Sequence, residues 1–300
     1  MADSLSNWLA LREPADIASR IAASGALAAL QPFVRALAAR ASSDRAMRIL
    51  DLAAGTGSNF RFLAGRLPAD QEWLLVDHDP VLLAEVPSRV RSWAHANSYD
   101  ASVEGPRTVV RGHGRVFVVE TRQLNLENPA ALDIFAGRHL VTASALLDLV
   151  SESWLQALAS NLRANGAAAL FTLSYDGTSQ CAPGEPEDDV VLELFNRHQG
   201  RDKGLGGPAA GPRAVAAAAR AFAAVGYPLQ REDSDWVLTP DQTELQRQLI
   251  EGWAAASTET APESAAKIAS WLARRLEHVR AGRSHVTVGH EDIAAWPLTL

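Results

Sequence analysis

Short apolar runs alternate with segments of helical periodicity between residues 46 and 175. The apolar runs occupy residues 48–52, 74–76, 116–120, 140–143 and 168–174. Continuous apolar runs of this length are typical of strands buried on both faces, while residues 154–162 repeat apolar side chains at helical spacing. Strands that alternate with helices predict an α/β fold, in which a mostly parallel sheet has helices on both faces.

Residues 1–45 have a helical pattern of their own. Apolar side chains recur there at Ile17, Ile21, Leu27, Leu30 and Phe33. Pro14 followed by Asp16 is a helix start signal, and Pro32 is expected to divide the segment into two helices. The pattern predicts an N-terminal helical cap over 1–45, in front of one domain over 46–300.

The composition changes after Tyr175. Residues 176–213 are rich in glycine and proline, which predicts a loop or lid that a short helix over 190–198 interrupts. The later pattern predicts, in order, a helix over 213–225, a strand over 229–238, helices over 241–282 that divide near Pro262, and a strand over 285–288. The stretch 87–114 shows no regular period.

Composition narrows the class of function. The 300 residues carry a formal net charge of −7, which argues against a nucleic-acid surface. Cys181 is the single cysteine, so neither an intramolecular disulfide nor a thiolate metal cluster is expected. The uncharged stretch 21–34 is too short, and too broken by Pro32, to span a bilayer. A cytoplasmic protein without a nucleic-acid or membrane partner is predicted.

The clearest motif reads Ile-Leu-Asp-Leu-Ala-Ala-Gly-Thr-Gly and runs from Ile49 to Gly57. Gly55 and Gly57 allow a sharp turn after the first strand and let a ligand lie against the main chain. A helix that starts near Ser58 would present free N–H groups to that ligand. Asp77, at the end of the second strand, can accept both hydroxyls of a ribose, so a nucleoside-containing cofactor is predicted.

Two features of the motif bear on which cofactor this is. Phe60 stands where a dinucleotide fingerprint has its third glycine. Asp51, inside the first strand, is a buried acid that suits a positively charged amino group and repels a pyrophosphate. The motif therefore disfavours a nicotinamide cofactor.

Over residues 46–175 the chain resembles the class I S-adenosylmethionine-dependent methyltransferases of the small-molecule type. Asp51, Gly55 and Gly57 match the family's first motif. Asp77, in Leu-Leu-Val-Asp-His-Asp-Pro, matches its ribose-binding acid. The resemblance implies a Rossmann-like sheet of seven mostly parallel strands with the last strand antiparallel. It also implies S-adenosyl-L-methionine as the cofactor and S-adenosyl-L-homocysteine as its product.

The resemblance also assigns a cofactor site. The residues expected to bind the cofactor are Asp51, Ala53, Gly55, Gly57, Ser58, Asn59, Asp77, His78, Leu124, Asn125, Ser144 and Arg20. Asn125 replaces an acid that usually lies near the adenine amino group, and Ser144 falls near the methionine moiety. The N-terminal helices of small-molecule relatives cap the cofactor, so Trp8, Arg12 and Arg20 are expected to close the site. Arg20 either pairs with the cofactor carboxylate or lies on a solvated face of its helix.

The same resemblance makes 229–238 and 285–288 the sixth and seventh strands. In many relatives a short turn joins these strands, whereas here the helical residues 241–282 separate them. This insertion is expected to pack on or near the active-site face.

Residues 196–203 concentrate cations, an imidazole and amides next to a glycine-rich loop. They form either a lid or a solvated charged loop. As a lid, they would bring Arg197, Arg201 or Lys203 to an anionic acceptor. His198 would then meet the nucleophile of the acceptor as a general base.

Further side chains have two interpretations each. Trp154 and Tyr175 either form walls of the acceptor pocket or pack in the core. Asp148 either lines that pocket or caps a helix. His285 and His290 have no partner ligands at metal spacing, so no metal is predicted.

Together these features predict an enzyme that transfers a methyl group from S-adenosylmethionine to a small-molecule acceptor by in-line displacement. A protein or RNA methyltransferase and a non-catalytic subunit that binds S-adenosylmethionine are the alternatives. A nicotinamide dehydrogenase comes last, because the third glycine is missing. The acceptor, its reacting atom (N, O, S or C), the need for a general base and the oligomeric state stay open.

Overall fold

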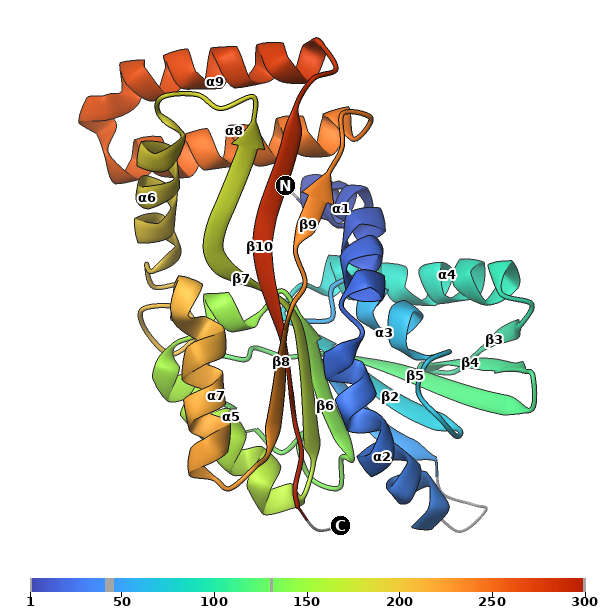
Figure 1. Cartoon of the computed structure of the whole chain (residues 1–300). Coiled ribbons are helices and arrows are strands. Elements are labelled where there is room, and N and C mark those ends of the chain that lie inside the picture. The colour runs from blue at the N-terminus through green and yellow to red at the C-terminus, as the bar shows by residue number, and fades with distance from the viewer. Residues whose placement is uncertain (1, 41–45, 130–131, 299–300) are drawn as a thin grey trace.

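A single sheet forms the centre of the molecule (Figure 1). The computed structural model describes residues 2–40, 46–129 and 132–298. The parallel strands are β1 (Met47–Leu52), β2 (Gln71–Asp77), β5 (Arg115–Gln123), β6 (Leu140–Ser144) and β7 (Ala168–Ala182). They lie in the order β5-β2-β1-β6-β7, so the strand order reverses between β1 and β6. In such a sheet the crevice for a ligand opens at the carboxyl ends of the strands on either side of the reversal.

The last strand of the chain runs against the others. β10 (His285–Ala295) is antiparallel to β7 on one side, and to β8 (Leu229–Asp233) and β9 (Trp236–Leu238) on the other. The predicted α/β fold, with a mostly parallel sheet and an antiparallel last strand, is confirmed. The single strand predicted over 229–238 is wrong, because two short strands pair there with different parts of β10.

β7 is longer than the sequence pattern suggests. The prediction that a loop starts at residue 176 is wrong, because β10 pairs with β7 as far as His285 opposite Ala182. Polar residues in this part of β7 hide the strand from an apolar-run criterion. After it comes α6 (Asp188–Gln199), which begins and ends slightly outside the predicted helix over 190–198.

The stretch 87–114 is regular, contrary to expectation. It holds most of α4 (Pro80–Ala96) and a hairpin of β3 (Asp100–Glu104) and β4 (Arg107–Gly112). Gly105, with φ +61°, makes the turn of the hairpin. The hairpin extends the sheet beyond β5 and is half open to solvent, so its polar residues obscure the period.

The N-terminal segment forms α1 (Ala2–Ala22) and α2 (Gly25–Arg40). The predicted break at Pro32 is wrong, since Pro32 and Pro14 both lie inside helices. The chain bends instead at residues 23–24, where the helices meet at 72°. The predicted boundary after residue 45 lies outside the described residues.

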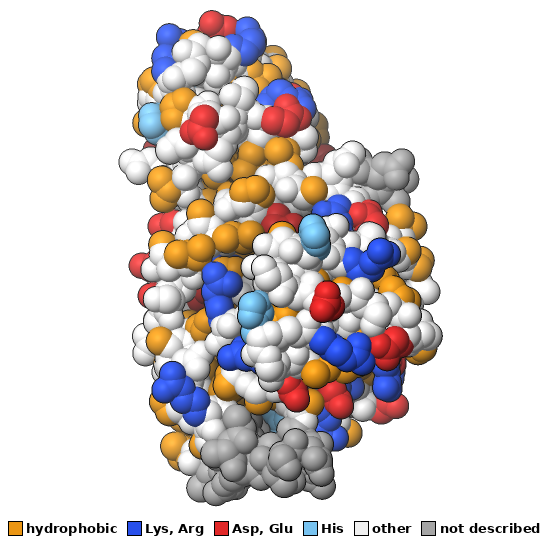
Figure 2. All heavy atoms as spheres, turned by 90° about the vertical axis from the view of Figure 1, so that its right-hand side faces the viewer, with side chains coloured by type: hydrophobic (Ala, Val, Ile, Leu, Met, Phe, Trp, Pro, Cys, Tyr) orange, Lys and Arg blue, Asp and Glu red, His pale blue; other side chains and the backbone are white. Residues whose placement is uncertain are grey.

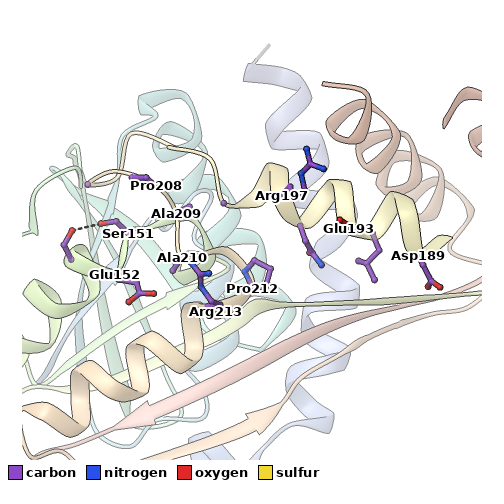
Figure 3. A pocket seen from close by; sticks show the side chains of 15 residues that line it. Ser151, Glu152, Asp189, Glu193, Arg197, Pro208, Ala209, Ala210, Pro212 and Arg213 are labelled. Atoms are coloured by element: carbon purple, nitrogen blue, oxygen red, sulfur yellow. Dashed lines mark hydrogen bonds between the residues drawn. The ribbon is translucent and has the colours of Figure 1, made fainter. Parts of the chain in front are cut away.

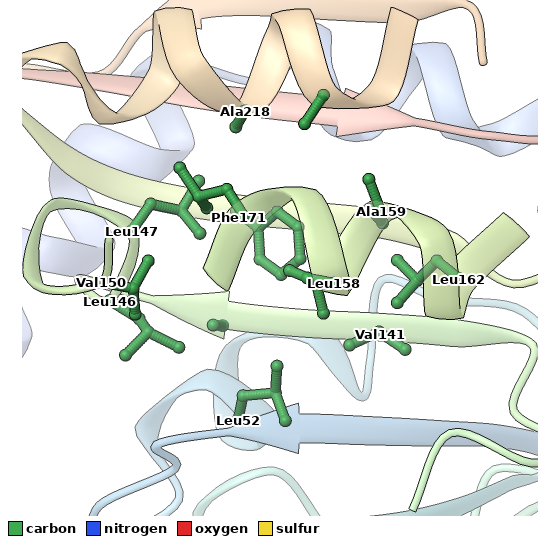
Figure 4. Close-up of a cluster of buried hydrophobic side chains, with 14 of the residues drawn as sticks. Leu52, Val141, Leu146, Leu147, Val150, Leu158, Ala159, Leu162, Phe171 and Ala218 are labelled. Atoms are coloured by element: carbon green, nitrogen blue, oxygen red, sulfur yellow. The ribbon is translucent and has the colours of Figure 1, made fainter. Parts of the chain in front are cut away.

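Helices cover both faces of the sheet. On one face α5 (Glu152–Asn165) and α7 (Ala214–Ala224) pack over β6 and β7, with Phe171 and Leu158 at the centre of the cluster (Figure 4). The opposite face carries α2, α3 (Ser58–Leu63) and α4, which enclose a second core around Phe60. The short 3-10 helices η2 (Leu147–Leu149) and η3 (Gly211–Arg213) precede α5 and α7, respectively.

The β7–β10 ribbon continues past the rest of the sheet and carries three helices. These are α6, α8 (Thr243–Thr260) and α9 (Ala265–Arg280), with η4 (Pro262–Ser264) between the last two (Figure 1). Their core includes Trp253 and Trp271. Arg275 is fully buried there and forms an ion pair with Asp188 of α6. The two helices expected over 241–282 thus lie beyond the carboxyl end of β7.

In the part of the chain that the structure describes, no single helix is long and apolar enough to cross a membrane. α1 and α2 meet that criterion only as a bent pair, by length and composition. On the face shown in Figure 2, basic and acidic side chains are interspersed, so no field of one sign covers it.

Candidate functional site

A cavity of about 480 Å³ lies where the strand order reverses, at the carboxyl ends of β1, β2 and β6. Its walls are Leu5, Trp8, Leu9, Arg12 and Asp16 of α1; Asp51, Ala53, Ala54, Gly55, Thr56, Ser58 and Asn59 around the first turn; Asp77, His78 and Leu82; Leu124, Asn125 and Leu126; Ser144, Ala145, Leu146 and Leu149; and Lys203, Gly204 and Leu205. Of the residues predicted to bind a cofactor, all but Gly57 and Arg20 line this cavity.

The turn after β1 depends on backbone conformations that favour glycine. Gly55 has φ +53° and Gly57 has φ +78°. A Cβ on Gly55 would lie 3.1 Å from Leu9 Cδ1, so α1 packs directly on the turn. Gly57 does not line the cavity. A Cβ there would lie 3.2 Å from Leu75 Cδ2 of β2. Gly55 therefore keeps the cavity open, while Gly57 lets α3 start close to the sheet.

Asp77 is locked to the same turn. Its Oδ2 accepts a hydrogen bond from the Gly55 N–H at 2.8 Å, and its Oδ1 accepts one from the Asp79 N–H at 2.9 Å. A carboxylate has further lone pairs, so Asp77 can still accept hydroxyl donors from a ligand. The neighbouring His78 is mostly exposed, with Nδ1 3.2 Å from Asp77 Oδ1. The carboxylate is thus oriented before any ligand arrives.

Asp51 is fully buried and only half satisfied. Its Oδ1 accepts from Asn59 Nδ2 at 2.7 Å, whereas Oδ2 has no hydrogen-bond partner in the described structure. Asn59 Nδ2 also donates to Thr142 Oγ1 at 3.0 Å, which fixes the amide. Desolvation raises the pKa of Asp51 to about 7. A cationic donor that reached Oδ2 would remove both the unmet hydrogen bond and the cost of burying the charge.

Arg20 lies behind the cavity wall rather than in it. Its Nη2 donates to Asn59 Oδ1 at 2.8 Å, and its guanidinium stacks on the Phe62 ring at 3.9 Å from the centroid. Burial lowers its pKa to about 10. The structure therefore gives Arg20 no contact with the cavity, and Asn59 stands between Arg20 and Asp51 with a hydrogen bond to each.

Arg12 reaches the cavity from α1. It pairs with Asp16 at 3.0 Å and lies over the Trp236 ring at 5.1 Å from the centroid. Trp8, one turn earlier on α1, lines the same wall. Of the three residues expected to close the site, Trp8 and Arg12 are in position.

The remaining predicted cofactor residues come from the strand ends. Leu124 follows β5, and its N–H donates to the Asp77 carbonyl at 2.8 Å. Asn125 Oδ1 accepts from the Glu127 N–H at 2.9 Å, which leaves its amide nitrogen available. Ser144 ends β6, next to Ala145, which has φ +54°.

The residues predicted to contact an acceptor are dispersed, and only Lys203 lines the cavity. Trp154 packs in the core with Nε1 donating to the Leu126 carbonyl at 2.6 Å. The Tyr175 hydroxyl donates to Asn196 Oδ1 at 2.8 Å. His198 Nε2 lies 3.2 Å from Glu259 Oε2.

Arg197 lines a separate, more open hollow of about 890 Å³ between α6, α5 and η3 (Figure 3). Ser151, Glu193 and Arg213 also face it. Its acidic and basic side chains are mixed, and it shares no lining residue with the cavity described above.

Sequence reasoning missed the apolar walls of the cavity. Leu5, Leu9, Leu149 and Leu205 line it without being part of any motif. For α1 a signal existed, because the cavity-facing positions 5, 8, 9, 12 and 16 follow helical spacing. For Leu205 the sequence offers none, since a loop residue is brought there by tertiary folding.

Among the described residues no group of three or more histidine, cysteine, aspartate or glutamate side chains could hold a metal ion. What the cavity offers is two oriented carboxylates, one paired arginine, one lysine and apolar walls. This set can bind a polar, nucleoside-like molecule and shield part of it from water.

No protein-family model matches the chain, and no curated protein matches it in sequence. Solved structures match it in part. One is the cyclopropane synthase MmaA2 from Mycobacterium tuberculosis, at 11% identity and TM-score 0.41, covering 88% of this chain and 83% of that one. Another is an S-adenosylmethionine-dependent methyltransferase from Geobacter sulfurreducens in complex with S-adenosyl-L-homocysteine, at 14% identity and TM-score 0.41, covering 89% of this chain and 90% of that one.

A third similar structure is a phosphoethanolamine N-methyltransferase from Haemonchus contortus, at 14% identity and TM-score 0.37. The match covers 88% of this chain and 52% of that one, so the chain spans about half the length of this protein.

Proposed function

We propose that the protein is an S-adenosylmethionine-dependent methyltransferase that acts on a small molecule. The observation that carries the proposal is the pair of carboxylates, Asp51 and Asp77, at the strand reversal. Asp77 has free lone pairs beside Gly55, and Asp51 has a buried oxygen without a partner. Two hydroxyls and a cationic amino group are the donors that such a pair fits best.

The residues of the cavity fit this cofactor. Asp77 would accept the ribose hydroxyls, and Asp51 Oδ2 would accept the amino group of the methionine moiety. Leu124 and Asn125 would border the adenine. Arg12, rather than the buried Arg20, would meet the cofactor carboxylate, because its guanidinium lies at the cavity wall.

When bound, the cofactor supplies an electrophilic methyl group on a sulfonium. The protein then has to align an acceptor with that group and exclude water. α1 contributes Leu5 and Leu9 to the cover of the cavity, and Leu205 covers it from the lid side. These apolar side chains would exclude water from the methyl group.

Two properties favour a small acceptor over a macromolecule. The cavity has a volume of about 480 Å³, and α1 and residues 203–205 form part of its wall, so it suits a small molecule better than a docked chain. The net charge of −7 also opposes binding to RNA or DNA. The proposal keeps the cytoplasm as the compartment, since the single Cys181 is a free thiol.

The first experiment is titration calorimetry with S-adenosyl-L-homocysteine on the wild type and on Asp77→Ala. Loss of two charge-assisted hydrogen bonds should weaken binding by about 100-fold, at ~1.5 kcal/mol or more each. The control is Asp133→Ala, whose side chain is 95% exposed and lies away from the cavity. Wild-type protein that fails to bind, or an Asp77→Ala variant that binds normally, would refute the cofactor assignment.

The second experiment separates the alternatives. Wild-type enzyme and methyl-labelled S-adenosylmethionine are incubated with a metabolite extract, and separately with protein and RNA fractions. Label in small molecules alone supports the proposal. Label in protein or RNA would replace it with a macromolecular methyltransferase. Tight cofactor binding without transfer to any fraction would favour a non-catalytic subunit.

A further inference from the structure

One buried carboxyl near the cavity has no role in binding the proposed cofactor. Asp148 lies in η2, where Leu146 just before the turn and Leu149 at its end line the cavity. Its side chain is buried, and Oδ1 has no hydrogen-bond partner in the described structure. Helix capping does not explain it, because Ser151 Oγ caps α5 by accepting from the Trp154 N–H at 3.1 Å. A buried and unsatisfied oxygen calls for a donor that the protein does not supply.

Lys203, in the predicted lid segment, is a charged donor without an acceptor in the described structure. Lys203 lines the cavity, and within the described residues no hydrogen bond or ion pair engages its ammonium group. Burial and the charge of Arg201 lower its pKa, while the charges of Asp148 and Glu259 act in the opposite sense. Arg12 and Lys203 likewise both lower the pKa of Asp148, which desolvation raises to about 6. Lys203 lines the same cavity as Leu146 and Leu149, which stand on either side of Asp148 in the chain, and no hydrogen bond or ion pair joins Asp148 to Lys203 in the described structure.

The loop keeps Lys203 at the wall of the cavity. The Leu205 carbonyl accepts from the Ser151 N–H at 3.1 Å, and the Gly204 N–H donates to Asp202 Oδ1 at 2.8 Å. A Cβ on Gly206 would lie 2.8 Å from Ser151 Oγ, so the loop lies directly on the start of α5. Residues 203–205 are thus fixed beside the η2 turn that carries Asp148.

The other charges around the cavity are accounted for. Arg12 pairs with Asp16 at 3.0 Å and, under the proposed function, also meets the cofactor carboxylate. Under the proposed function, Asp51 and Asp77 bind the cofactor. What remains for the second substrate is one carboxylate, Asp148, and one ammonium, Lys203. An anion would satisfy Lys203 alone and a cation would satisfy Asp148 alone, whereas a molecule with both charges satisfies both.

We propose that the methyl acceptor is a small amino acid-like zwitterion, whose anionic group pairs with Lys203 and whose amino group binds Asp148. The proposal rests on the proposed function and names its substrate class. It also gives the unpartnered Oδ1 of Asp148 its missing donor. The same carboxylate can accept the proton that an ammonium must lose before its nitrogen becomes a nucleophile. Apolar neighbours such as Leu149 and Leu205 limit the size of the ligand.

The test uses the full chain saturated with S-adenosyl-L-homocysteine. Binding is measured by calorimetry for the twenty protein amino acids and for straight-chain ω-amino acids of two to six carbons. Each is compared with its two single-charge fragments, the decarboxylated amine and the deaminated acid. We expect at least one zwitterion to bind about tenfold or more tightly than both of its fragments, since each fragment loses one charged contact.

Two variants assign the charges. Lys203→Met should weaken binding of the zwitterion and of the acid fragment by about tenfold, and leave the amine fragment unchanged. Asp148→Asn should weaken the zwitterion and the amine fragment but not the acid. Lys267→Met is the matched control, since Lys267 is the other lysine of the chain and is exposed on α9. It should change none of these affinities.

The outcomes separate this proposal from the proposed function. Wild-type protein that fails to bind S-adenosyl-L-homocysteine would overturn the function itself. If the cofactor product binds but no zwitterion exceeds its fragments, the acceptor class is wrong. The same conclusion follows if Lys203→Met leaves the affinity of a bound zwitterion unchanged. Because Lys203 lies on a loop, this last test stands even if Asp148→Asn does not fold.

Discussion

The two ends of the cavity are built in different ways. The end with Asp51, Gly55 and Asp77 comes from one strand–turn–helix–strand unit, in which hydrogen bonds tie each residue to its neighbours. The other end is assembled from α1, the η2 turn and residues 203–205, which lie far apart along the chain. A site whose residues lie close together in the chain can be recognised as a sequence motif, whereas a site assembled from distant segments cannot.

The largest effect should follow from Gly55→Val, which attacks the local end. A valine there faces φ +53° and a contact of 3.1 Å with Leu9, so both the turn and the seat of α1 must shift. We expect binding of S-adenosyl-L-homocysteine to fall by more than about 100-fold in calorimetry. Gly65→Val is the control, because a Cβ at Gly65 would have no neighbour within 4 Å. Normal binding by Gly55→Val would contradict the assigned turn.

The next effect concerns the unpartnered oxygen of Asp51. Its pKa is raised to about 7, so near pH 6 the free protein holds this proton. A cationic amino group favours the carboxylate, so binding of S-adenosyl-L-homocysteine should release a proton and strengthen as the pH rises towards 7. Calorimetry at pH 6 in two buffers of different ionisation enthalpy measures the release. Asp51→Asn should abolish it and weaken binding about tenfold. Equal release by both proteins would exclude Asp51 as the partner of the amino group.

The same carboxyl affects the stability of the ligand-free protein. Its folded pKa of about 7 exceeds the ordinary value of 3.8, so the folded state binds the proton more tightly than the unfolded chain does. The resulting stability is fully present below about pH 4 and is lost as the pH rises through about 7. The free energy of unfolding, measured with urea, should therefore fall as the pH rises from about 4 to about 7. It should fall less for Asp51→Asn than for the wild type. Parallel curves for the two proteins would contradict the raised pKa.

A smaller effect should follow from Gly206→Val, which attacks the distant end. Gly206 has φ +85°, and a side chain there meets Ser151 Oγ at 2.8 Å, so the loop should lift from α5. Trypsin should then cut after Lys203 several-fold faster, because cleavage follows the population of the open loop. The affinity for S-adenosyl-L-homocysteine should change much less than in Gly55→Val. Gly184→Val, with nothing within 4 Å, is the control. An unchanged cleavage rate would show that the loop does not depend on this contact.

The smallest effect is expected for His198→Ala. His198 pairs with Glu259, whose side chain is 64% exposed, and neither residue lines the cavity. The loss of such a pair should cost less than about 1 kcal/mol in urea denaturation and leave cofactor binding unchanged. A substantial loss of affinity would return His198 to the site.

The predictions from the sequence follow the same division. Apolar runs located the parallel strands, because a strand buried on both faces leaves few polar positions. Residues 176–182 and the β3–β4 hairpin show no such apolar run, because one side of these strands meets solvent. The predicted helix break at Pro32 is wrong for another reason. A proline favours a helix break locally, but the packing of α2 on the sheet retains the helix around it.

The candidate site shows the same contrast between two arginines. Arg20 and Arg12 lie two turns apart on α1, and the sequence gives no reason to prefer one of them. Tertiary packing places Arg20 against Asn59 and Phe62, and Arg12 at the cavity wall. Similarly, helix capping is a reasonable interpretation of Asp148 in the sequence, but Ser151 has that role in the structure.

The sequence by itself determined the α/β fold, the glycine turn after β1 and the carboxylates Asp51 and Asp77. These features depend on neighbours within a few residues or on the period of buried positions. Only the tertiary structure decided which lid residue reaches the cavity, which arginine faces it, and that the loop with Lys203 lies beside the segment that follows Asp148. These relations join distant segments of the chain, such as Arg20 and Asn59, which are 39 residues apart, and they depend on how helices and loops pack rather than on any local pattern.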